Sequence, residues 1–158
     1  MSHHGRLQCP RRLKVPDLSE TPPIEDWTAV GAPTAADIER LAETAFARLP
    51  EGFGKLCEGL VIQVVDFPDE ETLAEMGAQS EFELLGLFRG RGMAHSPAVA
   101  ETGTLPNMIW LYRRPLLDFW CEGEDALGIV VTHVLVHEIG HHFGLSDEDI
   151  EAIEAATA

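Results

Sequence analysis

The segment from Gly128 to Phe143 constrains the fold more than any other part of the chain. It is apolar at most positions and rich in isoleucine and valine, which by propensity alone would indicate a strand. However, it is too long for an ordinary strand, and the acidic residues 122–125 before it would complement the positive end of a helix. We therefore predict a helix here, and a helix that is apolar on nearly every side is a buried one.

Two histidines and a glutamate interrupt this apolar segment in the order His137-Glu138-Ile139-Gly140-His141. On a helix the two histidines project from one face within reach of a single ion, whereas on a strand they would be about 13 Å apart. Glu138 is rotated by about 100° from His137, which suits a group beside the metal rather than a ligand. Buried ionisable groups are costly without a partner, and a metal supplies one. The pattern predicts a zinc site in which Glu138 is the general base for a metal-activated water.

A third ligand is expected just after this helix. Gly144 can adopt a positive φ, end the helix and turn the chain back across the site. That return would bring Asp147 towards the metal, and zinc accepts a carboxylate oxygen at about 2.0–2.2 Å. The alternative is that Ser146 caps a final helix, with Asp149 at the capping-box position and Asp147 merely in the first turn. The two interpretations are compatible, so we predict Asp147 as the third ligand and keep Glu148 and Asp149 as fallback ligands.

Further histidines have more than one interpretation. His133 is four residues before His137 and shares its face, so it either lines the cleft or is a core histidine, and we favour the core interpretation. His142 is about 100° from His141 and is not expected to bind the metal. His95 lies in a long loop expected over residues 91–106, and the sequence does not place it.

The rest of the chain predicts an α+β domain, a small mixed sheet backed by helices. Residues 1–33 contain five prolines, which interrupt every candidate helix, so this part is expected to be an irregular extension. The domain is expected to span residues 34–158. It would begin with a helix that Thr34 and Asp37 close as a capping box and that Pro50 ends. Strands are expected over residues 60–65, 82–88 and 107–113, and a short acidic helix is expected after Asp69.

Charge and cysteine usage limit the partners and the compartment. The chain of 158 residues has 27 acidic and 11 basic side chains, a net charge of −16 that would repel nucleic acid and anionic membranes. No apolar run approaches the roughly 20 residues that cross a bilayer, and the N-terminus has no apolar signal core. The three cysteines have no paired spacing. We therefore expect a cytoplasmic protein with free thiols that binds neither nucleic acid nor membrane.

Three stretches of the domain occur in a recognisable order: LLGLF at 84–88, LYRRP at 111–115 and VLVHEIGHHFGLSD at 134–147. Together they resemble a zincin-like family of small bacterial proteins, described as zinc metallopeptidases because of their motif. The resemblance covers most of residues 34–158. It implies a minimal zincin-like metallopeptidase fold, in which the sheet packs on the buried HExxH helix and the cleft lies beside an edge strand.

The resemblance also implies roles for individual residues. The implied zinc ligands are His137, His141 and Asp147, and Glu138 is the base. Tyr112, with the two arginines that follow it, would stabilise the oxyanion or hold substrate, although a tyrosine on a strand is more often a packing residue.

The sequence therefore favours a Zn²⁺-dependent metallopeptidase that hydrolyses peptide or protein substrates with metal-activated water. Two alternatives remain open. One is a non-catalytic metal-binding protein with a structural zinc, which would need a fourth ligand such as His133, Glu148 or His95. The other is a metal-dependent hydrolase of a non-peptide amide.

Overall fold

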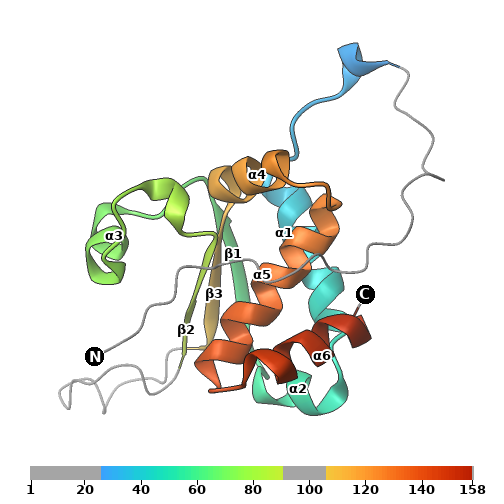
Figure 1. The fold of residues 1–158 in the computed structure, drawn as a ribbon, viewed down its shortest axis with the longest axis vertical. Coiled ribbons are helices and arrows are strands. Elements are labelled where there is room, and N and C mark those ends of the chain that lie inside the picture. The colour runs from blue at the N-terminus through green and yellow to red at the C-terminus, as the bar shows by residue number, and fades with distance from the viewer. Residues whose placement is uncertain (1–25, 91–105, 158) are drawn as a thin grey trace. The chain divides into compact units, whose positions relative to one another are not determined.

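The structure, a computed structural model, describes residues 26–90 and 106–157 (Figure 1). Contacts within the chain divide it into two units, residues 1–33 and 34–158, which are described separately. In the first unit, the described part contains a 3₁₀ turn, η2 (Trp27–Ala29), whose N-cap Asp26 accepts a hydrogen bond from the Thr28 backbone. The functional motif lies in the second unit.

The second unit combines helices with a small sheet, which confirms the predicted α+β class. A 3₁₀ turn, η3 (Glu81–Glu83), precedes the second strand. The helices and strands follow the order α1 (Ala35–Ala47), α2 (Glu51–Leu56), β1 (Val61–Val65), α3 (Glu70–Met76), β2 (Gly86–Arg89), β3 (Met108–Tyr112), α4 (Arg113–Glu122), α5 (Leu127–His142) and α6 (Asp147–Thr157).

The three strands form a mixed sheet in the order β1-β3-β2, with β1 parallel and β2 antiparallel to the central strand β3. Strand β2 is therefore an edge strand. Leu85, just before β2, accepts a hydrogen bond from the Tyr112 amide at 3.0 Å. Because backbone groups alternate in direction along an antiparallel pair, Leu87 and Arg89 also face β3, and Phe88 presents its N–H at the open edge. This edge lies next to the HExxH helix.

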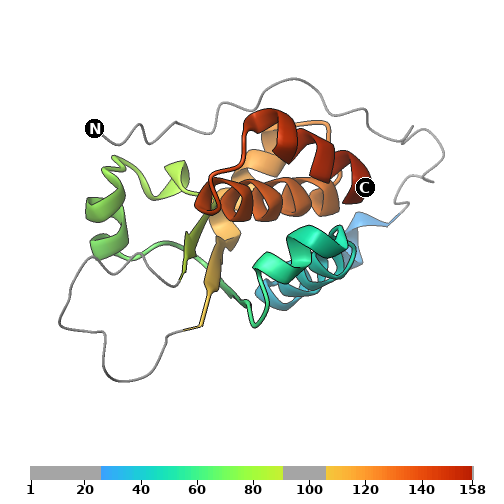
Figure 2. The same cartoon turned by 90° about the horizontal axis from the view of Figure 1, so that it is seen from below.

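One face of the sheet forms the core with α1 and α5. Ile109 and Leu111 of β3 are fully buried, and they share this face with Phe88 of β2. The sheet lies between α5 and α3 in both views (Figures 1 and 2). On the α3 side, Trp110 and Tyr112 line a cavity of about 550 Å³. The core face thus fixes α5 against the sheet, and the opposite face is only partly covered.

Helix α5 confirms that the segment rich in isoleucine and valine is helical, and it is buried along most of its length. The helix packs closely on β2 at Gly86, where an added Cβ would lie only 3.0 Å from Val134 Cγ1. The helix ends as predicted at Gly144, which has a φ of 72°. The Gly144 amide donates a hydrogen bond to the backbone carbonyl of His141 at 3.1 Å, and the Leu145 amide donates one to the carbonyl of Gly140 at 3.0 Å. This pair of bonds is a Schellman motif. This turn directs the chain into α6.

Local signals gave most of the other elements correctly. Thr34 and Asp37 form the predicted capping box of α1, and Asp69 caps α3. Two expectations were wrong in detail. The strand predicted over residues 82–88 begins only at Gly86, because residues 81–83 form the turn η3. Pro50 does not simply end α1 but occupies the N-cap of a further short helix, α2. None of the helices in residues 26–90 and 106–157 is long and apolar enough to cross a membrane.

Two of the three cysteines lie in the described part of the chain, and both are free thiols. Cys57 is fully buried, and burial raises the pKa of its thiol to about 11. Cys121 is exposed. In a Cys9→Ser protein we expect a disulfide reagent at pH 8 to label one thiol rapidly and the second only on unfolding, because a buried thiol is a poor nucleophile. Cys121→Ser in this background should remove the rapid phase, and two rapid thiols would contradict the burial of Cys57.

Candidate active site

Three histidines form a stripe along α5. His133, His137 and His141 are four residues apart, and their ring centroids are separated by 4.0 Å and 5.6 Å in turn. The stripe runs from the interior to the surface: His133 is 7% exposed and His137 is 5% exposed, whereas His141 is exposed to solvent. The predicted juxtaposition of the two motif histidines on one face of a helix is therefore present.

Helix α6 brings a carboxylate to the buried end of this stripe. Glu154 Oε1 lies 2.8 Å from His133 Nδ1 and 3.2 Å from His137 Nε2, and Glu154 is only 4% exposed. One ligand atom from each of the three residues lies within 4.8 Å of the others. We refer to His133, His137 and Glu154 as the buried triad. It is the group of three potential ligands that the described residues bring together.

The position of Glu154 follows from the pattern of α6. The helix begins as predicted, with the Ser146 hydroxyl accepting from the Asp149 amide at 3.2 Å and donating to its carboxylate at 2.8 Å. Its buried face carries Ile150, Glu154 and Thr157, at the spacing of an amphipathic helix. Glu154 was not among the site residues predicted from the sequence. A carboxylate on the apolar face of this helix was the signal that could have revealed it.

The buried triad has unsatisfied polar atoms. His133 Nδ1, both ring nitrogens of His137 and Glu154 Oε1 are buried and have no hydrogen-bond partner within residues 26–90 and 106–157. The contacts of Glu154 with the two imidazoles are short, but their angles do not meet those of hydrogen bonds. Burial disfavours the charged form of Glu154, but the two adjacent imidazoles outweigh it and hold its pKa below the ordinary value. Two imidazoles and a carboxylate with unused lone pairs fit a zinc ion.

Glu138 lies on the neighbouring face of α5, against the edge strand. Its carboxylate accepts a hydrogen bond from the backbone of Phe88, the residue whose N–H points away from β3. Burial raises the pKa of Glu138 to about 7, although the hydrogen bond from Phe88 lowers it. A carboxyl group with a pKa near neutrality can both accept and release a proton at physiological pH. Glu138 is not part of the buried triad, in keeping with a base rather than a ligand.

His142 packs on the same edge strand. Its ring lies 4.1 Å from that of Phe88, and a Cβ added to Gly90 would lie 2.4 Å from His142 Nε2. Burial lowers the pKa of His142 below its ordinary value. The contact fixes the end of α5 against β2, and with it the neighbouring Glu138.

The predicted third ligand, Asp147, is the first residue of α6 and is exposed, as are the fallback ligands Glu148 and Asp149. Asp147 and His141 lie outside the buried triad. The ligand set His137, His141 and Asp147 therefore stays a prediction. His133, which we favoured as a core histidine, is indeed buried, but it faces a carboxylate rather than apolar groups alone.

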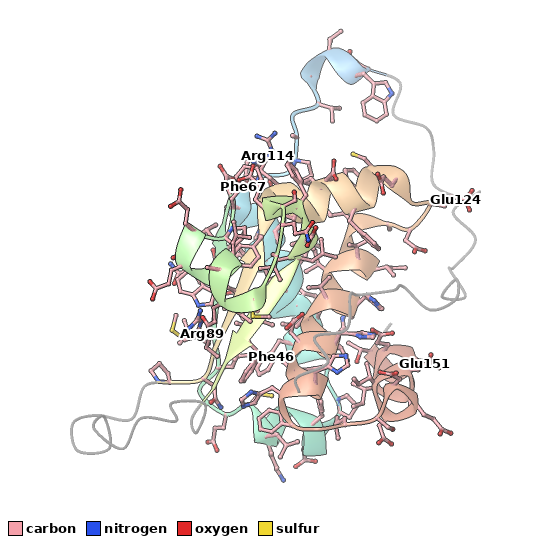
Figure 3. The ribbon with its side chains drawn as sticks, turned by 60° about the vertical axis from the view of Figure 1, so that its left-hand side comes forward. Phe46, Phe67, Arg89, Arg114, Glu124 and Glu151 are labelled. Atoms are coloured by element: carbon pink, nitrogen blue, oxygen red, sulfur yellow. The ribbon has the colours of Figure 1, made fainter. Side chains whose placement is uncertain are left out.

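Tyr112 and the arginines after it are not part of the buried triad, although the charge of Glu138 contributes to raising the pKa of Tyr112. Tyr112 is buried at the end of β3, where burial raises the pKa of its hydroxyl to about 12 and its hydroxyl contacts the Thr72 side chain. Arg113 forms an ion pair with Asp66 at 3.2 Å, and Arg114 stacks on Phe67 (Figure 3). These contacts account for the segment as packing, and a role of Tyr112 in catalysis stays a prediction. His95 lies outside the described residues.

Comparison with known proteins agrees with the motif and its setting. No curated protein matches the chain. The profile of a family described as zincin-like metallopeptidase matches residues 57–157, from the end of α2 through the sheet and α5 to the end of α6. The match includes the HExxH motif, the edge strand and Glu154, and it spans more than half of the sequence. The chain is therefore a member of the zincin-like metallopeptidase family.

Proposed function

We propose that this protein is a zinc-dependent peptidase that hydrolyses peptide bonds with Glu138 as the general base. The observation that carries the proposal is the arrangement of the motif on α5. His137 and His141 share one face, and Glu138 lies on the adjacent face, held against the edge strand by Phe88. Membership of the family supports the same activity. The donor set available to zinc includes His137 in every arrangement, with partners from the motif or from the buried triad.

When bound, zinc supplies Lewis-acid chemistry, which polarises a carbonyl group and makes a water molecule more acidic. The residues of the chain do the rest. Glu138 accepts a proton from the attacking water, and the oxygen of that water forms a bond to the peptide carbonyl carbon. Glu138 then delivers the proton to the leaving nitrogen as the C–N bond breaks, so that a carboxylic acid and an amine are the products, which exchange a proton and ionise at neutral pH.

Metal removal tests this function directly. We expect a chelator to abolish cleavage of a peptide library and one equivalent of zinc per chain to restore it. The library should contain basic and acidic peptides, because a net charge of −16 favours cationic substrates. Cleavage that persists without metal would refute the zinc-dependent mechanism. A protein that holds one zinc per chain and cleaves nothing in the library would refute the peptidase assignment.

A second candidate function is a non-catalytic protein with a structural metal. The observation in its favour is the burial of the triad, since each of its three residues is less than a tenth exposed. Structural zinc sites are closed by protein ligands, whereas catalytic sites keep a position open for water or substrate. The same library experiment distinguishes the two, because a structural site would bind zinc and stabilise the protein without any turnover.

The remaining expectations concern partners and compartment. Peptides or unfolded proteins are the proposed substrates, and the charge of the chain supports neither nucleic acid nor membrane as a partner. Cys57 and Cys121 are free thiols, which supports a reducing compartment such as the cytoplasm.

A further inference from the structure

We propose that His142 is a positioning residue for the hydrolysis. Its ring holds the edge strand β2 against the end of α5, so that the backbone N–H of Phe88 stays on the carboxylate of Glu138. The inference rests on the proposed function, in which Glu138 is the general base. It assigns no metal ligand, and both motif histidines, His137 and His141, remain available to zinc.

Helix α5 and the strand β2 make three successive contacts at matching intervals. Residues four apart on one side of α5 meet every second residue of the strand and the position just after it: Val134 with Gly86, Glu138 with Phe88, and His142 with Gly90. Four residues advance a helix by about 6.0 Å, and two residues advance a strand by about 6.4–6.8 Å. Because the two advances nearly agree, the helix and the strand stay in step over all three contacts.

Glycine occupies the strand side of the first and the third contact. A Cβ added to Gly86 would lie 3.0 Å from Val134 Cγ1. One added to Gly90 would lie 2.6 Å from His142 Cε1 and 2.7 Å from Phe88 Cε1. Neither glycine has a positive φ, so both are needed for space and not for backbone conformation. The contact at Gly90 places the His142 ring over the end of β2.

His142 also contacts the strand through an aromatic cluster. Its ring centroid lies 4.1 Å from that of Phe88, with the planes tilted by 32°. The ring of Phe143 completes the cluster, at 5.9 Å from Phe88 and 4.9 Å from His142. Aromatic pairs at such distances attract each other beyond the effect of their buried area. Phe88 is therefore attached to α5 twice, by its ring to His142 and by its backbone N–H to Glu138.

This double attachment orients the general base. A base must lie within hydrogen-bonding reach of the proton that it accepts, and a misplacement of about 1 Å can lower a rate by about 100-fold. The hydrogen bond from Phe88 restrains the Glu138 carboxylate, and it lasts only while the end of β2 stays close to α5. His142 therefore acts on Glu138 through Phe88 rather than on the substrate.

The first test measures kcat, KM and zinc content of the full-length, zinc-loaded protein. We expect His142→Ala to lower kcat by about 10–100-fold, with KM changed much less and one zinc still bound. His142→Phe keeps a flat ring and should restore most of the rate. Ile129→Ala is the matched control, because Ile129 is half-buried on the opposite side of α5 from Glu138, and it should leave kcat unchanged. A normal kcat in His142→Ala, loss of its zinc, or no rescue by phenylalanine would overturn the inference.

Amide hydrogen exchange of the metal-free proteins tests the contact without turnover. In the natural protein the Phe88 N–H is held by Glu138, whereas the Tyr112 N–H donates to Leu85 at 3.0 Å within the sheet. His142→Ala should accelerate exchange at Phe88 by about 10-fold or more and leave exchange at Tyr112 unchanged. Equal acceleration at both amides, or none at Phe88, would contradict the positioning role.

Gly90→Ala gives the same test from the strand, with α5 unchanged, and it replaces His142→Ala if that variant does not fold. Its methyl group would displace the His142 ring, so the same loss of kcat and the same acceleration at Phe88 are expected, and natural values for both would overturn the inference. If the natural protein cleaves no peptide, the peptidase is refuted, and exchange still decides whether His142 holds Phe88 on Glu138. Cleavage that His142→Ala leaves intact refutes only the positioning role.

Discussion

Replacing Glu138 by glutamine is expected to reduce the rate of peptide cleavage by about 10²–10⁴-fold while zinc remains bound. Glutamine has nearly the size of glutamate, and its amide oxygen can still accept the hydrogen bond that Phe88 makes to Glu138. It cannot take a proton from water or deliver one to the leaving nitrogen. The measurement is kcat on a library-derived peptide, together with zinc content per chain.

The stability of the metal-free natural protein and of the metal-free Glu138→Gln variant shows whether the substitution disturbs the fold. Burial raises the pKa of Glu138 from 4.5 to about 7, so the unfolded state releases this proton first as pH rises. The native protein therefore loses stability between about pH 4.5 and 7, and at pH 8 the glutamine variant should be at least as stable. A variant that retains zinc and fold but cleaves at the normal rate would show that Glu138 is not the base.

Much of the site could be predicted because its signals are local. The histidine spacing on a helix, the glycine that ends it and the serine cap that follows all depend on neighbouring residues. Helical structure in α5 required one further step, since β-branched residues favour strands. The length of the segment correctly indicated a helix. Nine residues of α5 are buried between α1, α6 and the sheet, and tertiary packing of this kind overrides a weak strand propensity.

The contribution of Glu154 could not be predicted with the same rules. Its partner His137 is 17 residues earlier, and the turn at Gly144 and the start of α6 lie between them. Which face of α6 is buried depends on how closely the two helices approach, and this distance is set by Gly140 and Ile150 in three dimensions. The HExxH motif specifies only residues of α5. A residue of another helix that contacts them can be identified only from how the two helices pack.

Shortening Ile150 to alanine is expected to lower the free energy of unfolding by about 2–5 kcal/mol, the usual cost of a cavity left by a fully buried isoleucine. Ile150 has no exposed surface and contacts α5 at Gly140. Ile153→Ala is the matched control on the same helix, because Ile153 is only half-buried and should cost less. Denaturant unfolding of the metal-free proteins measures both free energies. Equal losses of stability in the two variants would contradict the close packing of α6 on α5 at Gly140.

A double-mutant cycle with Gly140→Ala tests the contact itself. In the natural background the added methyl group would collide with Ile150 at a cost of about 1–3 kcal/mol, which at least cancels the roughly 1 kcal/mol that alanine gains over glycine in a helix. In the Ile150→Ala background the collision is gone, so the same substitution should be neutral or stabilising by up to about 1 kcal/mol. The two effects then differ by about 1–3 kcal/mol, a coupling that only residues in contact show. If the substitutions were additive, Gly140 would not determine how closely α6 approaches, and the carboxylate of Glu154 would reach His137 for another reason.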